Sequence, residues 1–397
     1  FIVDSIRTPV GRFKGTLSAI RPDDMAAMTI AELIKRNPSI ETKNIDDVIL
    51  GNANGAGEEN RNVARMSALL AGLPFTVPGE TVNRLCSSGA ASVINASRSL
   101  KLADSNLLIA GGVESMSRAP YVISKSAEPW GNSAEMFDSS FGWRFINPKL
   151  DSVYGTEGMG NTAENLVEMY GISREDQDAF AFWSQEKAAK ATQNGRLSKE
   201  IMPVEIPQKR KDPIIFNIDE FIRPGTTMEA LASLRPAFKK DGSVTAGNSS
   251  GLNDGACSIL LANEDGLEQN QLQAKAKIIS SAVVGVEPRI MGIGPVEASN
   301  QALAKAGLSF ADIDIIELNE AFAAQSLACT RAWGLDDDDK RLNPNGGAIA
   351  IGHPLGMTGA RLIGTATYEL IEQNKEFALV TMCVGVGQGY AVVIQRV

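Results

Sequence analysis

The sequence is poor in histidine and in positive charge, and each shortage excludes a class of function. It has 397 residues with one histidine, His353, and a net charge of −9 at pH 7. One imidazole excludes any metal site or catalytic mechanism that needs two. The excess of acidic residues argues against a nucleic-acid partner, because binding to a phosphate backbone depends on clustered Lys and Arg side chains.

Cysteines and long apolar runs are scarce as well. The four cysteines are widely scattered and form no C-x-x-C pair: Cys86, Cys257, Cys329 and Cys383. This spacing predicts neither a disulfide framework nor a zinc knuckle, and it fits the reducing cytoplasm. The apolar runs are broken by glycine, proline or charge, whereas a membrane span needs roughly 20 apolar residues. We therefore expect no membrane span and no bound metal.

The chain has enough apolar residues for a large core, and their order predicts an α/β fold. Hydrophobic residues make up 44% of the sequence. Strand-like and helix-like segments alternate, which is typical of mainly parallel sheets. The order strand, helix, strand, helix, strand occurs twice, which indicates an internal duplication. Its first copy comprises 48–50, 61–71, 81–85, 89–102 and 107–110, and its second comprises 313–318, 319–333, 348–351, 359–371 and 377–382.

The two copies share a short match of small residues. Ser88-Gly89-Ala90 begins one predicted helix and Thr358-Gly359-Ala360 begins the other, so the two helices could pack closely. Between the copies, the segment at roughly 117–245 differs in composition from the rest of the chain. We therefore predict that it is a long insertion over the core, with one clear helix at 174–194. The acidic run at 336–339 could suggest a cation site, but consecutive carboxylates repel one another and favour a solvated loop.

Cys86 is a candidate nucleophile. It lies in VNRLCSSGA at 82–90, where a strand-like segment ends in small residues that open a helix. Unpaired backbone N–H groups at a helix N-terminus favour the thiolate, which is the reactive form. The alternative is a buried structural cysteine, the commoner role of a free thiol.

Four other residues could take part in chemistry. His353 lies in a turn rich in glycine and proline before a helix, which suits a general base. Cys383 lies in a predicted hairpin whose G-x-G-x-G spacing is followed by a strand, so it is no dinucleotide fingerprint. Asn319 and Glu320 end a predicted parallel strand, an edge where ligands collect, although Asn319 could equally cap a helix.

Taken together, four separated motifs resemble the thiolase family, and the similarity runs essentially from end to end. The motifs are NRLCSSG at 83–89, NEAFA at 319–323, GHP through GAR at 352–361 and CVG at 383–385. The resemblance implies the thiolase fold, with two related halves stacked as helix, sheet, helix, sheet, helix and a loop domain over the site. It implies an N-terminal half of 1–117 plus 246–272, a loop domain of 118–245 and a C-terminal half of 273–397.

The resemblance also implies a mechanism. His353 takes the proton of Cys86, whose thiolate attacks a 3-oxoacyl thioester and becomes acylated, and Cys383 is the second acid and base. Asn319 would hold a water that completes one oxyanion hole with His353. The backbone N–H groups of Cys86 and Gly385 would form the other.

Coenzyme A is implied as a substrate, with no permanently bound cofactor. Its nucleotide end would lie near Arg223, and its pantetheine near Phe238, Ser250, Met159, Met291 and Phe322. The family also implies a homo-oligomer, either a dimer or a tetramer. Many relatives have glycine where this chain has Val386, which puts the shape of the hairpin tip in question.

The acyl chain is expected to carry a second carboxylate. FGWRFINP at 141–148 looks like the loop-domain segment of β-ketoadipyl-CoA thiolases from aromatic-acid catabolism, and Arg144 or Arg118 could bind the distal carboxylate of 3-oxoadipyl-CoA. Arg144 could instead bond an acidic residue of its own loop. Gly158-Met159-Gly160 stands where biosynthetic acetoacetyl-CoA enzymes usually have His-Met-Gly, which disfavours that role.

Other functions remain as alternatives. An acetyl-CoA acetyltransferase or a general 3-ketoacyl-CoA thiolase of fatty-acid oxidation would use the same residues. A decarboxylating ketosynthase would need Cys-His-His, which one histidine excludes, or Cys-His-Asn, which has no use for Cys383. A thiolase-like scaffold that binds lipid without turnover would have no reason to retain Cys86, His353 and Cys383.

Overall fold

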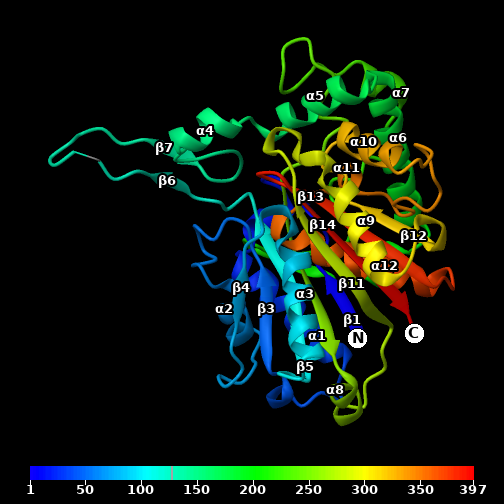
Figure 1. Cartoon of the computed structure of the whole chain (residues 1–397). Helices are drawn as coiled ribbons and strands as arrows, with labels where there is room; N and C mark the ends of the chain where they lie inside the picture. Colours follow the sequence, from blue (N-terminus) through cyan, green and yellow to red (C-terminus); the bar gives the residue numbers. More distant parts are fainter. Residues whose placement is uncertain (127) are drawn as a thin grey trace.

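A computed structural model describes residues 1–126 and 128–397, and within them the core is one ten-stranded sheet in two halves (Figure 1). The first half comprises β1 (Ile2–Arg7), β2 (Gly11–Arg12), β3 (Asp47–Gly51), β4 (Glu80–Val82), β5 (Leu107–Ser115) and β10 (Asn253–Ala262). The second comprises β11 (Ala276–Gly285), β12 (Ile315–Leu318), β13 (Phe377–Val384) and β14 (Gln388–Arg396). The halves meet at β1 and β11, where Ile2 is paired with Ala276.

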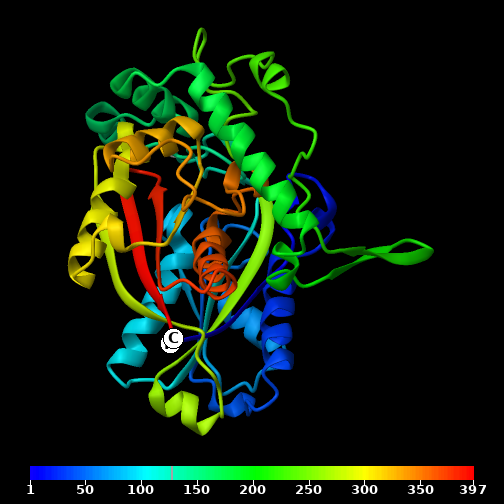
Figure 2. The same ribbon diagram turned by 90° about the vertical axis from the view of Figure 1, so that its right-hand side faces the viewer.

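Two helices fill the space between the half-sheets. α3 (Ser88–Lys101) packs on α12 (Leu355–Glu372), and α12 also contacts strands of both halves (Figure 2). The contact is close because glycines face it: a Cβ on Gly89 would lie 2.6 Å from the Gly356 carbonyl oxygen, and one on Gly359 would lie 2.4 Å from the Ala90 nitrogen. The close packing predicted from the matched small residues is therefore confirmed.

Further helices cover the outer faces and complete five layers. α1 (Pro22–Arg36) and α2 (Val63–Leu70) pack on the first half-sheet, and α9 (Gly294–Ala306) packs on the second with α10 (Ala323–Ala332) beside it. Asp23 and Asp24 begin α1 and Lys35 and Arg36 end it, an order that suits the helix dipole. The expected stack of helix, sheet, helix, sheet, helix is confirmed. No helix within the described ranges is both long and apolar enough to cross a membrane.

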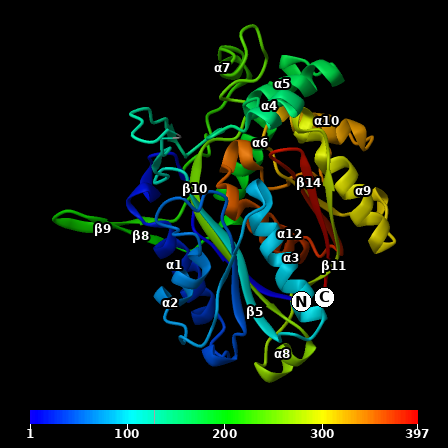
Figure 3. The same cartoon turned by 60° about the vertical axis from the view of Figure 1, so that its left-hand side comes forward.

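The segment between the two copies lies over one end of the core. It contains β6 (Tyr121–Ile123), β7 (Met136–Asp138), α4 (Pro148–Tyr154), α5 (Met159–Tyr170), α6 (Arg174–Gln193), β8 (Val204–Gln208), β9 (Lys211–Phe216) and α7 (Met228–Ala232). The helix predicted at 174–194 is α6, which begins where the Ser173 side chain accepts a hydrogen bond from the Asp176 N–H. The β6–β7 and β8–β9 arms project from the body (Figures 1 and 3). The domain boundaries given above stay a prediction.

One predicted strand is wrong. Residues 348–351 form the short helix α11 (Ala348–Ile351) instead. Elsewhere in the chain, α8 (Glu264–Gln269) is another short helix. Four consecutive buried apolar residues do not distinguish a strand from a helix turn. The helix is favoured here because the buried Glu320 carboxylate accepts the Ile349 N–H at 3.2 Å, which satisfies a free donor in the first turn.

Candidate active site

Cys86 lies on a single 3-10 turn, Leu85–Ser87, that leads directly into α3. Leu85 adopts a positive φ of 48°, and the Ser88 hydroxyl oxygen accepts the Arg84 N–H at 2.9 Å, so the turn has a defined shape. Burial raises the pKa of the Cys86 thiol, and the backbone N–H groups of Gly385 and Cys86 oppose the rise. The helix N-terminus alone therefore does not make a thiolate, contrary to the sequence-based expectation. At rest Cys86 is a thiol that needs a base.

His353 is buried in the loop between α11 and α12, with its ring held on both sides. The Thr358 hydroxyl donates to the Pro354 carbonyl at 2.8 Å, so it must accept the hydrogen bond of 2.7 Å that joins it to His353 Nδ1. The ring proton is therefore on Nδ1, and Nε2 is free to accept. The Asn319 amide nitrogen lies 3.4 Å from that Nε2. Burial, with a smaller effect of Arg361, lowers the pKa of His353 to about 3, so the imidazole is neutral at pH 7.

Cys383 occupies the end of β13, at the hairpin that joins β13 to β14. Val384 pairs with Gln388, so Gly385, Val386 and Gly387 form the tip. Burial raises the pKa of Cys383 well above its usual value, and the Cys86 thiol adds to the rise. Cys383 is therefore a neutral thiol that can donate a proton. The predicted hairpin is confirmed, and Val386 keeps its tip left-handed with φ of 62°.

Asn319 and Glu320 follow β12 but point to different environments. The position of Asn319 is fixed by a backbone hydrogen bond. Its N–H donates to the Thr381 carbonyl at 3.0 Å, next to the parallel pair of β12 and β13. Its Oδ1 is buried and has no hydrogen-bond partner within the described residues. Glu320 instead accepts from Ser184 at 2.6 Å and Asn343 at 2.7 Å. Since α10 begins at Ala323, Asn319 is not a helix cap.

Cys86 opens into a cavity of about 280 Å³. Most of its wall is apolar and comes from both the core and the inserted segment: Leu85, Met116, Phe141, Trp143, Met159, Leu355 and Val386. Two charged side chains, Glu114 and Arg144, also line it. A mainly apolar cavity with a few polar groups and a thiol at one end suits an acyl chain.

Glu114 is a site residue that the sequence reasoning missed. It is buried at the end of β5, and its carboxylate accepts N–H groups from Ala53 at 2.9 Å, Asn54 at 3.1 Å and Gly356 at 2.8 Å. Burial raises the pKa of Glu114 to about 7, and nearby Glu59 adds to the rise. A lone carboxylate at the end of the apolar run LLIAGGVES could have identified it, by the argument used for Asn319.

The residues expected to bind coenzyme A divide into two groups. Met159, Met291 and Phe322 pack in one apolar cluster with Cys383. Phe238 lies edge to face on Phe322 with ring centroids 6.0 Å apart. Ser250 joins this group because its hydroxyl donates to the Ala321 carbonyl at 3.1 Å.

Arg223 belongs to the other group, away from this cluster. It lines a separate cavity of about 340 Å³ together with Lys190, and its guanidinium lies 5.5 Å from the Phe221 ring centroid. The structure thus places one cationic region apart from one apolar region.

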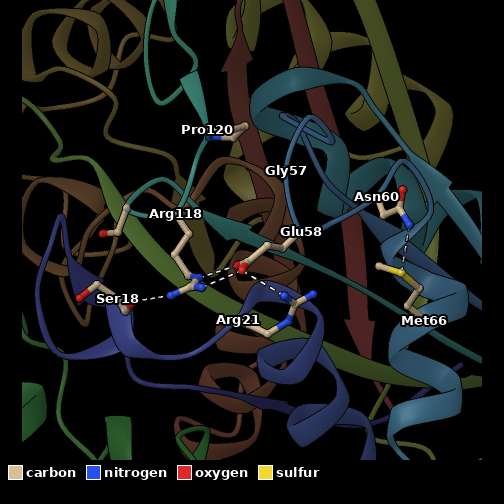
Figure 4. Close-up of a pocket in the computed structure, with 9 residues that line it drawn as sticks. Ser18, Arg21, Gly57, Glu58, Asn60, Met66, Arg118 and Pro120 are labelled. Atoms are coloured by element: carbon tan, nitrogen blue, oxygen red, sulfur yellow. Dashed lines mark hydrogen bonds and ion pairs between the residues drawn. The ribbon is translucent and has the colours of Figure 1, made fainter. Parts of the chain in front are cut away.

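The two arginines proposed for a distal carboxylate occupy different places. Arg118 does not line the Cys86 cavity; it lines another of about 570 Å³ (Figure 4). Both carboxylate oxygens of Glu58 bind its guanidinium, at 2.5 and 2.7 Å, and Arg21 bonds the same carboxylate. Its charge is thus already paired, which leaves Arg144 as the candidate.

Arg144 has neutral partners. Its guanidinium donates to the Ser139 carbonyl at 3.4 Å and to Asn54 Oδ1 at 3.2 Å. The alternative in which Arg144 bonds an acidic residue of its own loop does not match these contacts. Trp143 packs beside it and donates to the Glu157 carbonyl at 3.2 Å.

The acidic run at 336–339 forms no cation site. Asp337, Asp338 and Asp339 pair with Arg331, Lys340 and Arg341 respectively. Within residues 1–126 and 128–397, no group of three or more His, Cys, Asp or Glu side chains is placed to hold a metal. Three of the four carboxylates are thus occupied by neighbouring cations.

Comparison with known proteins agrees with the fold and the motifs. The family models "Thiolase, N-terminal domain" and "Thiolase, C-terminal domain" match residues 1–265 and 272–396. A β-ketoadipyl-CoA thiolase of Acinetobacter baylyi is 56% identical, and a 3-oxoadipyl-CoA/3-oxo-5,6-dehydrosuberyl-CoA thiolase of Escherichia coli is 54% identical, each over 100% of this chain and 99% of the relative. The crystal structure of the Bacillus anthracis acetyl-CoA acetyltransferase has a TM-score of 0.92 at 40% identity, covering 100% of this chain and 98% of that one. The chain belongs to the thiolase family of acyltransferases.

Proposed function

We propose that this thiolase cleaves 3-oxoadipyl-CoA with coenzyme A to give succinyl-CoA and acetyl-CoA, as a step of aromatic-acid catabolism. The observation that carries the proposal is the Arg144 guanidinium, which lines the Cys86 cavity with neutral partners. A dicarboxylic acyl chain bound through Cys86 would bring its distal carboxylate to this cation. The relatives named above for the same substrate are more similar to this chain than the acetyl-CoA acetyltransferase is.

In the first half of the reaction, His353 Nε2 takes the Cys86 proton as the sulfur attacks the 3-oxo carbonyl. Both groups are neutral at rest, so proton transfer accompanies the attack. The C2–C3 bond then breaks, and its electron pair goes to C2 of the departing acetyl-CoA. The Cys383 thiol protonates C2, which leaves a succinyl group on Cys86.

In the second half, the thiol of coenzyme A gives its proton to the Cys383 thiolate and attacks the succinyl thioester. Cys86 leaves and regains its proton from His353, so every group returns to its starting state. Negative charge develops on the carbonyl oxygen in each half. The backbone N–H groups of Cys86 and Gly385 and a water on Asn319 Oδ1 would stabilise it, and each such donor is worth roughly 100- to 1000-fold in rate.

Charge complementarity supports a dicarboxylic substrate. A carboxylate left unpaired in a closed apolar cavity would cost several kcal/mol, whereas a guanidinium can bind it through two parallel hydrogen bonds. Coenzyme A would be a substrate, with no resident cofactor. Its pantetheine would run along the cluster of Met159, Met291 and Phe322, and Arg223 would lie toward the nucleotide.

A matched pair of substrates tests the proposal. 3-Oxoadipyl-CoA and 3-oxohexanoyl-CoA have the same six-carbon chain and differ by a terminal carboxylate or methyl group. We expect the wild-type enzyme to prefer the dicarboxylate in kcat/KM, and Arg144→Ala to reduce that preference by roughly 10- to 100-fold. Equal kcat/KM for both substrates in the wild type would contradict 3-oxoadipyl-CoA as the preferred substrate. A preference that survives Arg144→Ala would contradict only the role of Arg144 in binding the distal carboxylate.

The same kcat/KM assay, with acetoacetyl-CoA as a third substrate, separates the alternative functions. A general 3-ketoacyl-CoA thiolase would favour the neutral chain, an acetyl-CoA acetyltransferase would favour acetoacetyl-CoA, and a scaffold would show no turnover with any of them.

We also infer a cytoplasmic homo-oligomer, either a dimer or a tetramer. The apolar residues Leu69 and Leu70, at the end of α2, and Phe75, in the loop that follows, are 46%, 55% and 82% exposed, which favours a covered surface. Light scattering coupled to gel filtration would measure the mass, and a monomer at micromolar concentration would contradict this inference.

A further inference from the structure

Asn54 links Arg144 to the wall of the cavity. It lies in the loop after β3, and its side chain lines the Cys86 cavity with Ser139 and Arg144. Its Oδ1 accepts from the Arg144 guanidinium at 3.2 Å. Its Nδ2 lies 3.2 Å from both the carbonyl oxygen and the hydroxyl oxygen of Ser139.

These contacts determine how the amide is oriented. The Ser139 carbonyl can only accept a hydrogen bond, so the NH₂ group of Asn54 must face it. The amide oxygen consequently faces the guanidinium, which can only donate. Asparagine therefore satisfies both neighbours at once and adds no charge. Aspartate has the same shape, but it would repel the carbonyl and neutralise the cation.

The loop that carries Asn54 is itself attached to the catalytic core. The Asn54 N–H donates to Glu114, and the same carboxylate accepts the N–H of Gly356, at the start of the helix that follows His353. Gly55 comes next with φ of 62°, a conformation that glycine adopts without strain. Asn54 thus has its backbone tied to the core and its side chain tied to the inserted segment.

We propose that Asn54 is a positioning residue that determines specificity for the charged end of the acyl chain. Its neutral amide holds the Arg144 guanidinium at the cavity wall while leaving its positive charge available for a substrate carboxylate. This inference rests on the proposed function, in which the substrate carries a distal carboxylate. Asn54 acts through Arg144 and does not touch the reacting atoms.

The sharpest test is Asn54→Asp, which keeps the side-chain shape and adds one negative charge beside Arg144. We expect the ratio of kcat/KM for 3-oxoadipyl-CoA to kcat/KM for 3-oxohexanoyl-CoA to fall by roughly 10-fold or more, chiefly through the KM of the dicarboxylate. If Asn54 had a merely structural role, its substitution would lower kcat/KM for both substrates by the same factor and leave their ratio unchanged. An unchanged ratio in Asn54→Asp would therefore overturn the proposal.

Two further variants keep the test decisive. Asn54→Ala removes the acceptor without adding charge, so we expect a fall in the ratio smaller than that of Asn54→Asp. If Asn54→Asp fails to fold, an unchanged ratio in Asn54→Ala is by itself enough to overturn the proposal.

Asn60→Asp is the matched control. It makes the same chemical change on an exposed side chain outside the Cys86 cavity, and it should keep the wild-type ratio. If Asn60→Asp lowers the ratio as much as Asn54→Asp does, the effect is one of net charge and the positioning role is wrong.

The outcome for the proposed function is read separately. A wild-type enzyme that does not prefer 3-oxoadipyl-CoA contradicts the substrate, and the inference about Asn54 falls with it. A wild-type preference that Arg144→Ala abolishes but Asn54→Asp leaves intact supports the proposed function and overturns the role of Asn54.

Discussion

The two ends of the proposed site, the Cys86 end and the Arg144 end, are built from different parts of the chain and carry different charge. At the catalytic end, the proposed catalytic residues Cys86, His353 and Cys383 come from the layers of the core, are uncharged at rest, and have their pKa values shifted mainly by burial. At the far end, Arg144 lies on the inserted segment, is half-buried, and bonds only neutral groups within the described residues. The core thus carries groups that could serve any 3-oxoacyl thioester. The inserted segment carries the group that could select one.

This comparison predicts that changes at the catalytic end affect all substrates alike, whereas changes at the far end alter the ratio between substrates. The largest effect is expected for Cys86→Ala, which removes the proposed nucleophile. Turnover of every 3-oxoacyl-CoA should fall by more than about 10,000-fold. Intact mass spectrometry after incubation with acetyl-CoA should show an acetyl adduct on the wild type and none on the variant. Cys257→Ala, a change at a buried thiol bonded to Ser5, should retain the adduct. A stable adduct on Cys86→Ala would refute the assignment.

Cys383→Ala should separate acylation from carbon–carbon chemistry. The thiol proposed to protonate C2 is lost, but Cys86 and His353 remain, so slow acetylation by acetyl-CoA should persist. Thiolysis and condensation should fall by on the order of 100- to 10,000-fold for dicarboxylic and neutral chains alike. The measurement combines the mass of the acyl-enzyme with steady-state rates for both substrates. Selective loss for one of the two would break the distinction between the ends.

His353 offers a test of how strongly burial controls the catalytic end. It is the one histidine of the chain, so its imidazole resonance in proton NMR needs no assignment. With a folded pKa lowered to about 3, the resonance should not shift between pH 5 and 8. In urea it should titrate near 6.5. A midpoint between 6 and 7 in the folded protein would contradict the buried neutral ring.

The same shift predicts a pH dependence of stability. The unfolded state binds the extra proton between about pH 6.5 and 3, so the free energy of unfolding falls as the pH drops through that range. His353→Gln should therefore lose less stability than the wild type between pH 7 and pH 5. Urea unfolding of both proteins at the two pH values measures the difference. Equal losses of unfolding free energy in the two proteins would show that His353 does not contribute to the pH dependence of stability.

The smallest effect is expected at the hairpin tip, where Val386 lines the Cys86 cavity. Val386 is β-branched, yet it adopts a left-handed φ of 62°, a conformation that costs an L-residue roughly 1–2 kcal/mol. Val386→Asn should raise the free energy of unfolding by about 1 kcal/mol, since asparagine tolerates this conformation. Val283→Asn changes a valine of similar exposure within β11 and should give no gain. Equal effects of the two substitutions in urea unfolding would argue against strain at Val386.

Features that depend on local pattern could be predicted from the amino-acid sequence. Alternating segments predicted the α/β layers, but the mainly parallel sheet they also predicted is wrong, because β1, β10, β11 and β14 pair antiparallel with their neighbours. Matched small residues predicted the contact of α3 with α12, because close helix packing requires them. The hairpin after Cys383 followed from a glycine-rich turn between two apolar runs. Four motifs in the order of a known family indicated the family, which the comparisons confirm, and the proposed nucleophile with its partners.

Tertiary structure alone decided the features that depend on burial or on contacts between distant residues. The helix at 348–351 forms over Glu320, and Arg118 is paired with Glu58, 60 residues earlier in the chain. The high pKa of Cys86 follows from burial, which a helix-start pattern does not report. The bond between Asn54 and Arg144 spans 90 residues, so no local signal could have revealed it. Local pattern predicts which groups a protein carries, but their ionisation and their partners depend on what the fold packs around them.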